Sequence, residues 1–166
     1  MNSLNSSRPR VALFEPRIPQ NTGTIGRTCL AFDLSLDIIK PTGFSFKDKY
    51  LKRAGLDYWS NVDVNLHDSF NLYKKTFTES RIIALTKKSN NSISNIMYKN
   101  TDILLFGRED TGLPDNIISN CEIVAGIPMP GGEDQFRTGG VRSLNLAVAC
   151  GIVCYSVCLQ LNLLSE

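Results

Sequence analysis

Residues 102–114 read DILLFGREDTGLP and combine the signals of a strand, a turn and a helix start. The segment DILLF is an apolar run of strand length, which is typical of a strand covered on both faces in a parallel sheet. Gly107 permits a close backbone approach at the end of this strand, Gly112 permits a left-handed turn, and Pro114 can open the next helix. The stretch therefore predicts a strand followed by a helix, which is the repeating unit of an α/β fold.

Similar apolar runs recur along the chain, with helical patterns between most of them. Helices are expected from Pro19 to about residue 33, over 47–54 (short and basic) and over 68–77, with a long final helix from about Arg142. The expected strands cover residues 10–15 (RVALFE), 34–40 (LSLDIIK), 62–66, 81–86 (RIIALT), 102–106 and 122–127 (EIVAGI). We therefore predict an α/β fold with a mostly parallel sheet and flanking helices.

The length of 166 residues suits one domain, because a chain of this size buries roughly 70% of its unfolded surface. The first ten residues are rich in Asn, Ser and Arg, and we predict a disordered tail over 1–9, which leaves 10–166 as the single domain. Five cysteines without paired spacing, and the lack of a signal peptide, favour a reduced, cytoplasmic setting. The apolar stretch 144–164 is interrupted by polar residues, so we expect a buried helix and no membrane partner.

The formal net charge of +2 hides two halves of opposite sign. Residues 1–100 carry 15 basic and 8 acidic side chains, whereas residues 101–166 carry 3 and 8. The first part, at +7, is suited to a polyanion such as RNA, and the second, at −5, is not.

The common nucleotide and metal motifs are missing. No G-x-G-x-x-G follows the first strand, and the glycine spacing of 107–112 lacks the Lys and Ser or Thr of a phosphate loop. With His67 as the single histidine, a zinc site or a Ser-His-Asp triad is not expected, and a surface or capping role is the better interpretation of His67. Cys150, Cys154 and Cys158 share a helix face, which small apolar packing explains better than metal binding.

Ligands of open parallel sheets bind beyond the carboxyl ends of the strands. The segments that follow such ends are residues 21–27, 107–114 and 128–145, and the functional site is expected there.

These segments carry three motifs that resemble those of the SPOUT RNA methyltransferases. They are N-T-G-x-x-x-R over 21–27, F-G-x-E-x-x-G-L-P over 106–114, and I-P-M over 127–129 followed by R-S-L-N-L-A-V-A over 142–149. Within that family the chain is similar to the single-domain TrmH/TrmL-like tRNA (cytidine/uridine-34) 2'-O-methyltransferases. F-E-P-R-I-P-Q-N-T-G from Phe14 and R-A-G-L-D-Y from Arg53 strengthen this resemblance, which covers about residues 10–163.

The resemblance implies a C-terminal trefoil knot, a homodimer through the C-terminal helix, and S-adenosylmethionine as cofactor, with no metal. The implied reaction is 2'-O-methylation of the wobble nucleotide, C or U at position 34, of a tRNA partner. Two alternatives remain: the same transfer to another RNA, because the motifs bind the cofactor and not the base, and a catalytically silent RNA-binding relative.

The resemblance also assigns residues to roles. The implied cofactor contacts are Leu85, Thr86, Gly107, Glu109, Ile127, Met129, Ser143 and Leu144. The implied catalytic residues are Arg27, Ser143 and Asn145, and the implied RNA contacts are Arg17, Arg27, Arg53, Arg142 and Tyr155. Core packing is the alternative for Leu85 and Ile127, and an ordinary turn with a capping glutamate is the alternative for Glu109.

Arg27 is the residue to which the family assigns the reaction. A guanidinium stays protonated and is a poor general base, so we expect Arg27 to orient a phosphate or to stabilise the ribose 2'-oxygen as negative charge develops. The alternative is a structural helix arginine paired with a carboxylate such as Glu109.

Two features of the C-terminal part leave further alternatives open. The segment 130–141 is several residues longer than is usual in the subgroup, and it either covers the cofactor or is a tolerated surface insertion. Val148, Ile152, Tyr155 and Leu159 recur at three or four positions, which fits a dimer face or core packing within one subunit.

Overall fold

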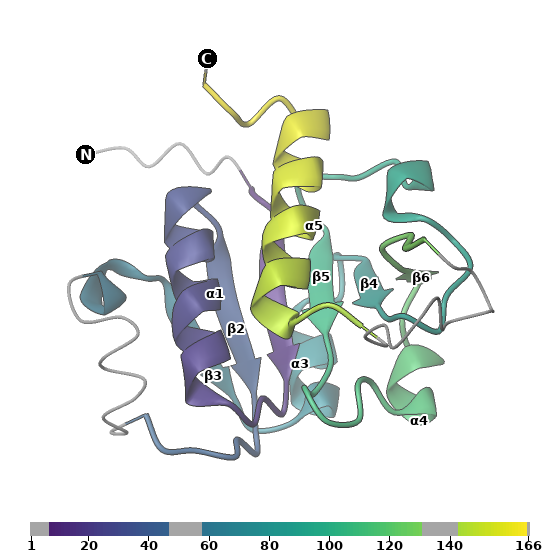
Figure 1. Ribbon diagram of the computed structural model, residues 1–166. Coiled ribbons are helices and arrows are strands. Elements are labelled where there is room, and N and C mark those ends of the chain that lie inside the picture. Colours follow the sequence, from purple (N-terminus) through teal and green to yellow (C-terminus); the bar gives the residue numbers. More distant parts are fainter. Residues whose placement is uncertain (1–6, 47–57, 131–142, 166) are drawn as a thin grey trace.

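The computed structural model describes residues 7–46, 58–130 and 143–165 (Figure 1). The strands are β1 (Arg10–Phe14), β2 (Ser35–Ile39), β3 (Val64–His67), β4 (Ile82–Leu85), β5 (Ile103–Phe106) and β6 (Ile123–Ala125). The helices are α1 (Pro19–Ala31), α3 (Phe70–Thr76), α4 (Asp115–Ile118) and α5 (Leu146–Gln160), with the 3-10 turns η1 (Trp59–Asn61) and η2 (Ile93–Asn95).

The six strands form one sheet in the order β3-β2-β1-β5-β4-β6, and every neighbouring pair of these strands is parallel. The chain moves outward from β1 through β2 to β3, and then crosses to the other side of β1 to form β4, β5 and β6. The strand order therefore reverses between β1 and β5, which is the position where ligands bind in open parallel sheets. The predicted α/β fold with a parallel sheet is confirmed.

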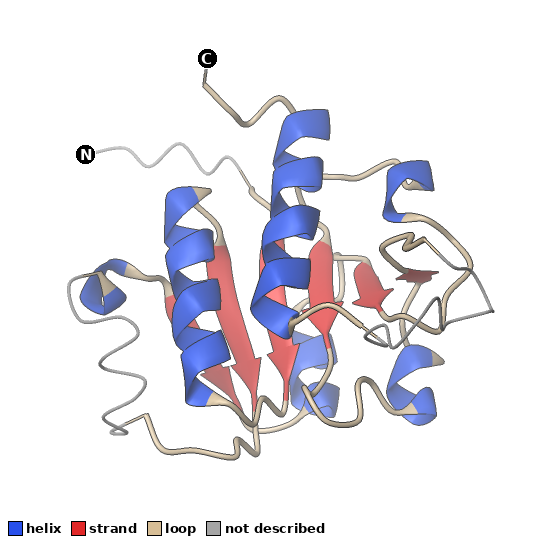
Figure 2. Ribbon diagram, viewed as in Figure 1, coloured by secondary structure: helices blue, strands red, loops and turns tan. Residues whose placement is uncertain are grey.

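Helices cover both faces of the sheet, with α1 and α5 side by side on one face and α3 on the other (Figure 2). Successive side chains of a strand point to opposite faces, so each strand feeds both cores. In β1, Val11 and Leu13 pack with the core under α1 and α5, whereas Ala12 and Phe14 pack with the core that includes α3 and α4. This two-sided burial explains why the strands read as continuous apolar runs.

The predicted element boundaries differ from the observed ones mainly at the last helix. α5 begins at Leu146, not near Arg142, because Asn145 is its N-cap and accepts hydrogen bonds from the backbone N–H groups of Ala147 (2.8 Å) and Val148 (3.3 Å). The predicted basic helix over 47–54 lies outside the described residues. Residues 1–6 of the predicted tail also lie outside the described residues. Arg8, in the rest of that predicted tail, forms an ion pair in which its Nε lies 3.2 Å from Oδ2 of Asp33.

A buried carboxylate stabilises the α3 side of the sheet. Asp37, in the middle of β2, is fully buried and accepts hydrogen bonds from two guanidinium nitrogens of Arg10 (2.6 and 2.7 Å) and from the Tyr73 hydroxyl (2.8 Å). The His67 ring lies 3.3 Å from the same carboxylate. His67 is therefore not the surface or capping residue that we predicted, because its position at the end of β3 places the ring against Asp37.

The cysteines of α5 pack in the core between α5 and α1. Cys150, Cys154 and Cys158 are fully buried together with Cys29 of α1, as the packing interpretation predicted. Burial raises the pKa of the Cys158 thiol to about 11 and also raises the pKa of Cys29. Of the helices that the structure describes, none is long and apolar enough to cross a membrane.

Candidate cofactor and RNA site

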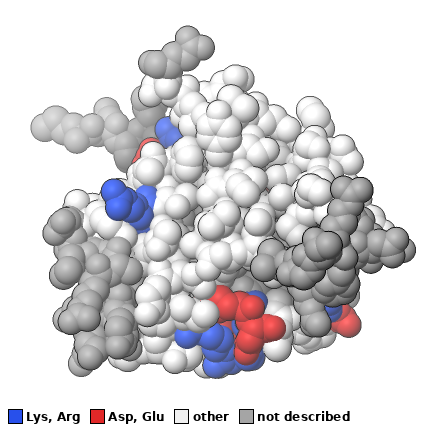
Figure 3. Space-filling model, viewed as in Figure 1, with Lys and Arg blue, Asp and Glu red and all other residues white. Residues whose placement is uncertain are grey.

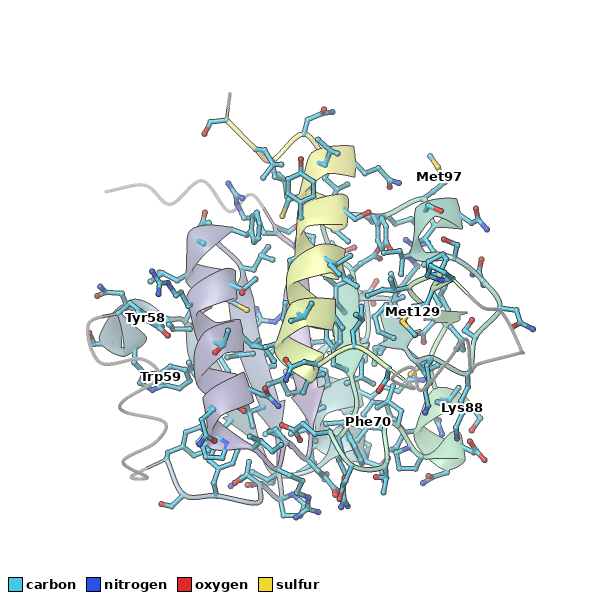
Figure 4. The ribbon with its side chains drawn as sticks, in the orientation of Figure 1. Tyr58, Trp59, Phe70, Lys88, Met97 and Met129 are labelled. Carbon is cyan, nitrogen blue, oxygen red and sulfur yellow. The ribbon has the colours of Figure 1, made fainter. Side chains whose placement is uncertain are left out.

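A cavity of about 450 Å³ lies at the carboxyl ends of β4, β5 and β6. Its walls come from the segments 85–88, 106–113 and 126–129, from the start of α5, and from Ile18 and Asn21 at the start of α1. Met129 and Lys88 mark its side of the molecule in Figure 4. The three segments in which the sequence predicted a site therefore meet at one place.

The turn after β5 needs two glycines for different reasons. A Cβ on Gly107 would lie 2.3 Å from the backbone nitrogen of Leu113 and from the carbonyl carbon of Gly112, so only glycine fits this close approach. Gly112 has φ +70°, the left-handed conformation that side chains disfavour, although its surroundings are open. Reciprocal backbone hydrogen bonds between Arg108 and Gly112 (3.2 and 2.9 Å) close the turn. The two glycines thus let the backbone of this loop turn back on itself in the cavity wall.

Glu109 links this turn to the start of α1. Its carboxylate accepts hydrogen bonds from the backbone N–H groups of Arg17 (2.8 Å) and Ile18 (3.1 Å), with the Asn21 amide at 3.4 Å. Ile18 is the N-cap of α1 and has no capping side-chain hydrogen bond of its own, so Glu109 supplies an acceptor from a distant part of the chain.

Asn21 extends the same connection to α5. The Asn145 amide nitrogen donates to the Asn21 side-chain oxygen at 3.1 Å, while the Asn145 oxygen caps α5. A single hydrogen-bonded chain, Glu109–Asn21–Asn145, therefore ties together the three motif segments. Sequence reasoning quoted Asn21 within its motif but did not single it out as a site residue.

Apolar side chains supply another part of the cavity wall. Leu85 ends β4, Ile127 follows β6 by two residues, Met129 is 38% exposed, and Leu144 comes from the segment before α5. Leu85 also belongs to the core, so the packing role and the cavity role coexist.

All eight residues predicted as cofactor contacts line this cavity, and Asn145 lines it as well. Arg17, Arg27 and Tyr155 are not among its lining residues. Arg53 and Arg142 lie outside the described residues, as does most of the long 130–141 segment.

Comparison with known proteins gives the family. Residues 8–155 match the model of the SpoU rRNA Methylase family. The chain belongs to this family. It is 37% identical over 152 residues to the tRNA (cytidine(34)-2'-O)-methyltransferase of Escherichia coli K12, which covers 92% of this chain and 93% of that protein. It is 38% identical over 157 residues to the protein of the same name from Yersinia pestis, with the same coverage.

Solved structures described in terms of RNA methylation share the fold. One of them concerns the 2-OH methylation of C/U34 on tRNA. It superposes on this chain with a TM-score of 0.85 at 38% identity, and the match covers 95% of this chain and 99% of that chain. An AdoMet-bound rRNA methyltransferase from Sinorhizobium meliloti superposes with a TM-score of 0.80 at 26% identity, over 97% of this chain and 59% of that chain. The resemblance found in the motifs is thus confirmed over most of the chain.

In this SpoU family member, Arg27 lies away from the cavity. It follows Asn21 by six residues, which at about 100° per residue leaves the two side chains about 120° apart around α1. Arg27 is an exposed residue, and its guanidinium carbon lies 5.6 Å from the centroid of the Tyr58 ring. The alternative of an Arg27–Glu109 pair is wrong, because Glu109 is on the cavity side of α1 and is engaged by backbone N–H groups.

Charged side chains surround the rim of the cavity near the end of β1. Arg108 donates two hydrogen bonds to Asp110 (2.9 and 2.7 Å), which lower the pKa of Asp110 to about 2. Glu15 lies between the guanidinium groups of Arg108 (3.7 Å) and Arg17 (3.4 Å). Figure 3 shows basic and acidic side chains crowded at the lower edge of the molecule. Arg17 thus lies beside the rim, although it does not line the cavity.

Sequence reasoning missed two further lining features. A Cβ on Gly126 would lie 2.7 Å from the carbonyl oxygen of Thr86, so a glycine is needed where β6 passes the end of β4. The glycine in the run EIVAGI was the available signal. Lys87 and Lys88 line the cavity through their position after β4, and Lys88 lies 3.1 Å from Asp115.

Proposed function

We propose that this protein is an S-adenosylmethionine-dependent methyltransferase that methylates the ribose 2'-oxygen of nucleotide 34, C or U, in tRNA. The observation that carries the proposal is the convergence of all eight motif-derived cofactor residues on one cavity. The names of the Escherichia coli and Yersinia pestis relatives, both tRNA (cytidine(34)-2'-O)-methyltransferases, support nucleotide 34 of tRNA as the target.

The cavity suits S-adenosylmethionine in size and in chemistry. Its volume of about 450 Å³ falls within the roughly 300–1,000 Å³ of small-molecule sites. Leu85, Ile127, Met129 and Leu144 can enclose the faces of an adenine, while backbone groups at the strand ends can bind its polar edge. The close Gly107–Leu113 approach holds the turn that forms part of the cavity wall.

S-adenosylmethionine, when bound, supplies an electrophilic methyl group on a sulfonium sulfur. The protein must align the ribose 2'-oxygen with that methyl group, which requires positioning more than acid–base strength. Ser143, exposed just before α5, and Asn145 at its N-cap lie beside the cavity and can orient the incoming ribose. Arg27 binds a phosphate or stabilises negative charge as it develops on the 2'-oxygen.

A homodimer through α5 is part of the proposal. Val148, Ile152, Tyr155 and Leu159 are 40–55% exposed on the outer face of α5, so core packing within one subunit does not explain their spacing. Figure 3 shows a face over α1 and α5 that is nearly free of charge. Contiguous exposed apolar surface of this kind is typical of a protein interface.

Dimerisation would also explain where Arg27 acts. Val148 is less than one helical turn from Asn145, so a second copy packed on α5 comes close to the cavity. Its own α1 would bring another Arg27 to that region. Arg27, which points away from the cavity of its own chain, can then serve the RNA bound across the dimer.

The family resemblance further supports a C-terminal trefoil knot. The five free cysteines support a cytoplasmic location, where thiols stay reduced. The net charge of +7 over residues 1–100 supports electrostatic tRNA binding, and we expect the affinity to fall steeply as the salt concentration rises. An affinity that stays constant across a salt series would contradict this mode of binding.

The decisive experiment incubates the purified protein with total tRNA and labelled methyl donor, and then maps the labelled nucleotide by mass spectrometry. We expect 2'-O-methylation at position 34. Arg27→Ala should abolish methylation, with cofactor binding nearly intact by calorimetry, because Arg27 does not line the cavity. Equal loss of both would indicate a structural role for Arg27.

The same experiment separates the two alternatives. Label at another tRNA position or in rRNA would indicate a different RNA substrate for the same chemistry. No label, together with no heat of cofactor binding, would indicate a silent RNA-binding relative. A sedimentation measurement that gives a stable monomer at micromolar concentration would contradict the dimer.

A further inference from the structure

α1 carries two glycines on the side that faces away from the sheet centre, toward the segment after residue 57. Gly23 and Gly26 lie within the helix, where each glycine costs roughly 0.5–1 kcal/mol relative to alanine. Both are buried, although the helix leaves its neighbours Thr24 and Arg27 exposed. Something must therefore lie against α1 at these two positions.

The aromatic pair Tyr58–Trp59 occupies that place. The Tyr58 hydroxyl donates to the backbone carbonyl of Gly23 at 3.1 Å. A Cβ on Gly26 would lie 2.5 Å from a ring carbon of Trp59, so the indole rests directly on the helix backbone. In Figure 4 both rings come from the segment beside the outer side of α1.

Arg27 lies on the same surface. Its guanidinium carbon is 5.6 Å from the centroid of the Tyr58 ring, within the range of a cation–π contact. Of the carboxylates that the structure describes, none forms an ion pair with Arg27. An exposed arginine has many rotamers, and the Tyr58 ring favours those in which the guanidinium stays over the aromatic face.

We propose that Tyr58 and Trp59 are positioning residues for Arg27. Trp59, seated on Gly26, fixes the aromatic segment against α1, and Tyr58 holds the guanidinium in the orientation that meets the RNA. The inference rests on the proposed function, in which Arg27 acts on the ribose or its phosphate. It explains why the helix has a glycine at position 26 and why Tyr58 has both its ring and its hydroxyl, which the cavity does not explain.

The test compares substitutions that leave the cavity untouched. Tyr58→Leu removes the ring, and we expect the kcat of tRNA methylation to fall about two- to fivefold, the rate equivalent of an exposed cation–π contact. Tyr58→Phe keeps the ring and should restore most of the rate. The dissociation constant of S-adenosylmethionine should stay unchanged in both variants, because neither Tyr58 nor Arg27 lines the cavity.

Gly26→Ala is the second probe. Alanine favours the helix, so a lower rate cannot come from a weaker α1, but its Cβ must displace Trp59. We expect kcat to fall at least as much as in Tyr58→Leu. Thr24→Ala, an exposed change in the same helix, is the matched control and should keep the wild-type rate.

The outcomes separate the positioning role from the function itself. A wild-type protein that methylates no tRNA would overturn the proposed function. An inactive Arg27→Ala beside full rates in Tyr58→Leu and Gly26→Ala would overturn the positioning role alone. Equal rates in Tyr58→Leu and Tyr58→Phe, or a rate that falls only together with the melting temperature and cofactor affinity, would also overturn it.

Discussion

Glu109 offers the sharpest test of how the cavity is built, because two roles compete for its carboxylate. It lines the cavity as a candidate cofactor contact, and it also accepts hydrogen bonds from the loop between β1 and α1. Glu109→Ala removes the carboxylate, and Glu109→Gln replaces it with a group of the same shape that has one acceptor oxygen.

The size of the effect follows from the contacts. The backbone N–H groups of Arg17 (2.8 Å) and Ile18 (3.1 Å) each donate to one oxygen of the Glu109 carboxylate. Hydrogen bonds to a charged group contribute roughly 1.5–3 kcal/mol each. The Asn21 contact, at 3.4 Å, is too long to add much. Because Glu109 is half-buried, we take the lower end of the range. Glu109→Ala should lower the free energy of unfolding by about 3 kcal/mol, and Glu109→Gln by about half as much.

Urea unfolding without cofactor measures this directly. An unchanged m-value would show that the unfolded state is the same, so that the midpoint reports stability. Glu79→Ala is the matched control, because Glu79 is exposed and a surface change of this kind usually stays within about 0.5 kcal/mol of wild type. Glu109→Ala with a wild-type midpoint and much weaker cofactor binding would refute the structural role and assign the carboxylate to the cofactor.

Three further outcomes are expected. Gly107→Ala should weaken S-adenosylmethionine binding more than tenfold in calorimetry, because its Cβ would displace Leu113, whereas Gly112→Ala should mainly destabilise the fold by about 1–2 kcal/mol through its φ of +70°. Burial raises the pKa of Tyr98 to about 12, so the folded protein holds the phenol proton more tightly than the unfolded chain does. The stabilisation from this difference is complete below pH 10 and is lost between pH 10 and 12. Tyr98→Phe should therefore reduce the fall in unfolding free energy over that pH range by up to roughly 2–3 kcal/mol. With Ellman's reagent, the half-buried Cys121 should react first and slowly, since its pKa is raised to about 11, and the four buried thiols should react only on unfolding; a fast-reacting buried thiol would contradict the packing described.

The sheet could be predicted from the sequence because its strands are buried on both faces. A run such as ILLF in β5 has no polar alternation, and at this length, before a glycine turn, an uninterrupted apolar run is typical of a buried parallel strand. Strand order was not predictable. The pairing of β1 with β5 joins residues more than 90 positions apart, and no local pattern encodes it.

The start of α5 was misplaced because local signals conflict there. The predicted start near Arg142 precedes Asn145, whose side-chain oxygen caps the helix and requires a non-helical backbone. The sequence R-S-L-N contains two residues that can cap a helix, Ser143 and Asn145. Only the contact of Asn145 with Asn21, from the first motif, decides between them.

The residues predicted to contact the cofactor all line one cavity, but the motifs alone do not show which contacts each of them makes within the protein. Nothing near Glu109 in sequence shows that its carboxylate meets the backbone of residues 17 and 18. Likewise, the helical spacing in N-T-G-x-x-x-R turns Arg27 away from Asn21, yet the aromatic partner at Tyr58 is 31 positions further along the chain. Contacts between distant segments carry this information.

The central place of β1 has a consequence for synthesis on the ribosome. β2 can pair with one edge of β1 soon after it emerges, but the other edge waits for β5. At the usual 5–20 residues per second, that wait lasts roughly 5–20 s. During this wait one edge of the apolar strand β1 stays unpaired, and an unpaired strand edge is a site for mispairing with other chains. Chaperone dependence and inclusion-body formation should therefore respond to changes in translation speed between residues 40 and 106.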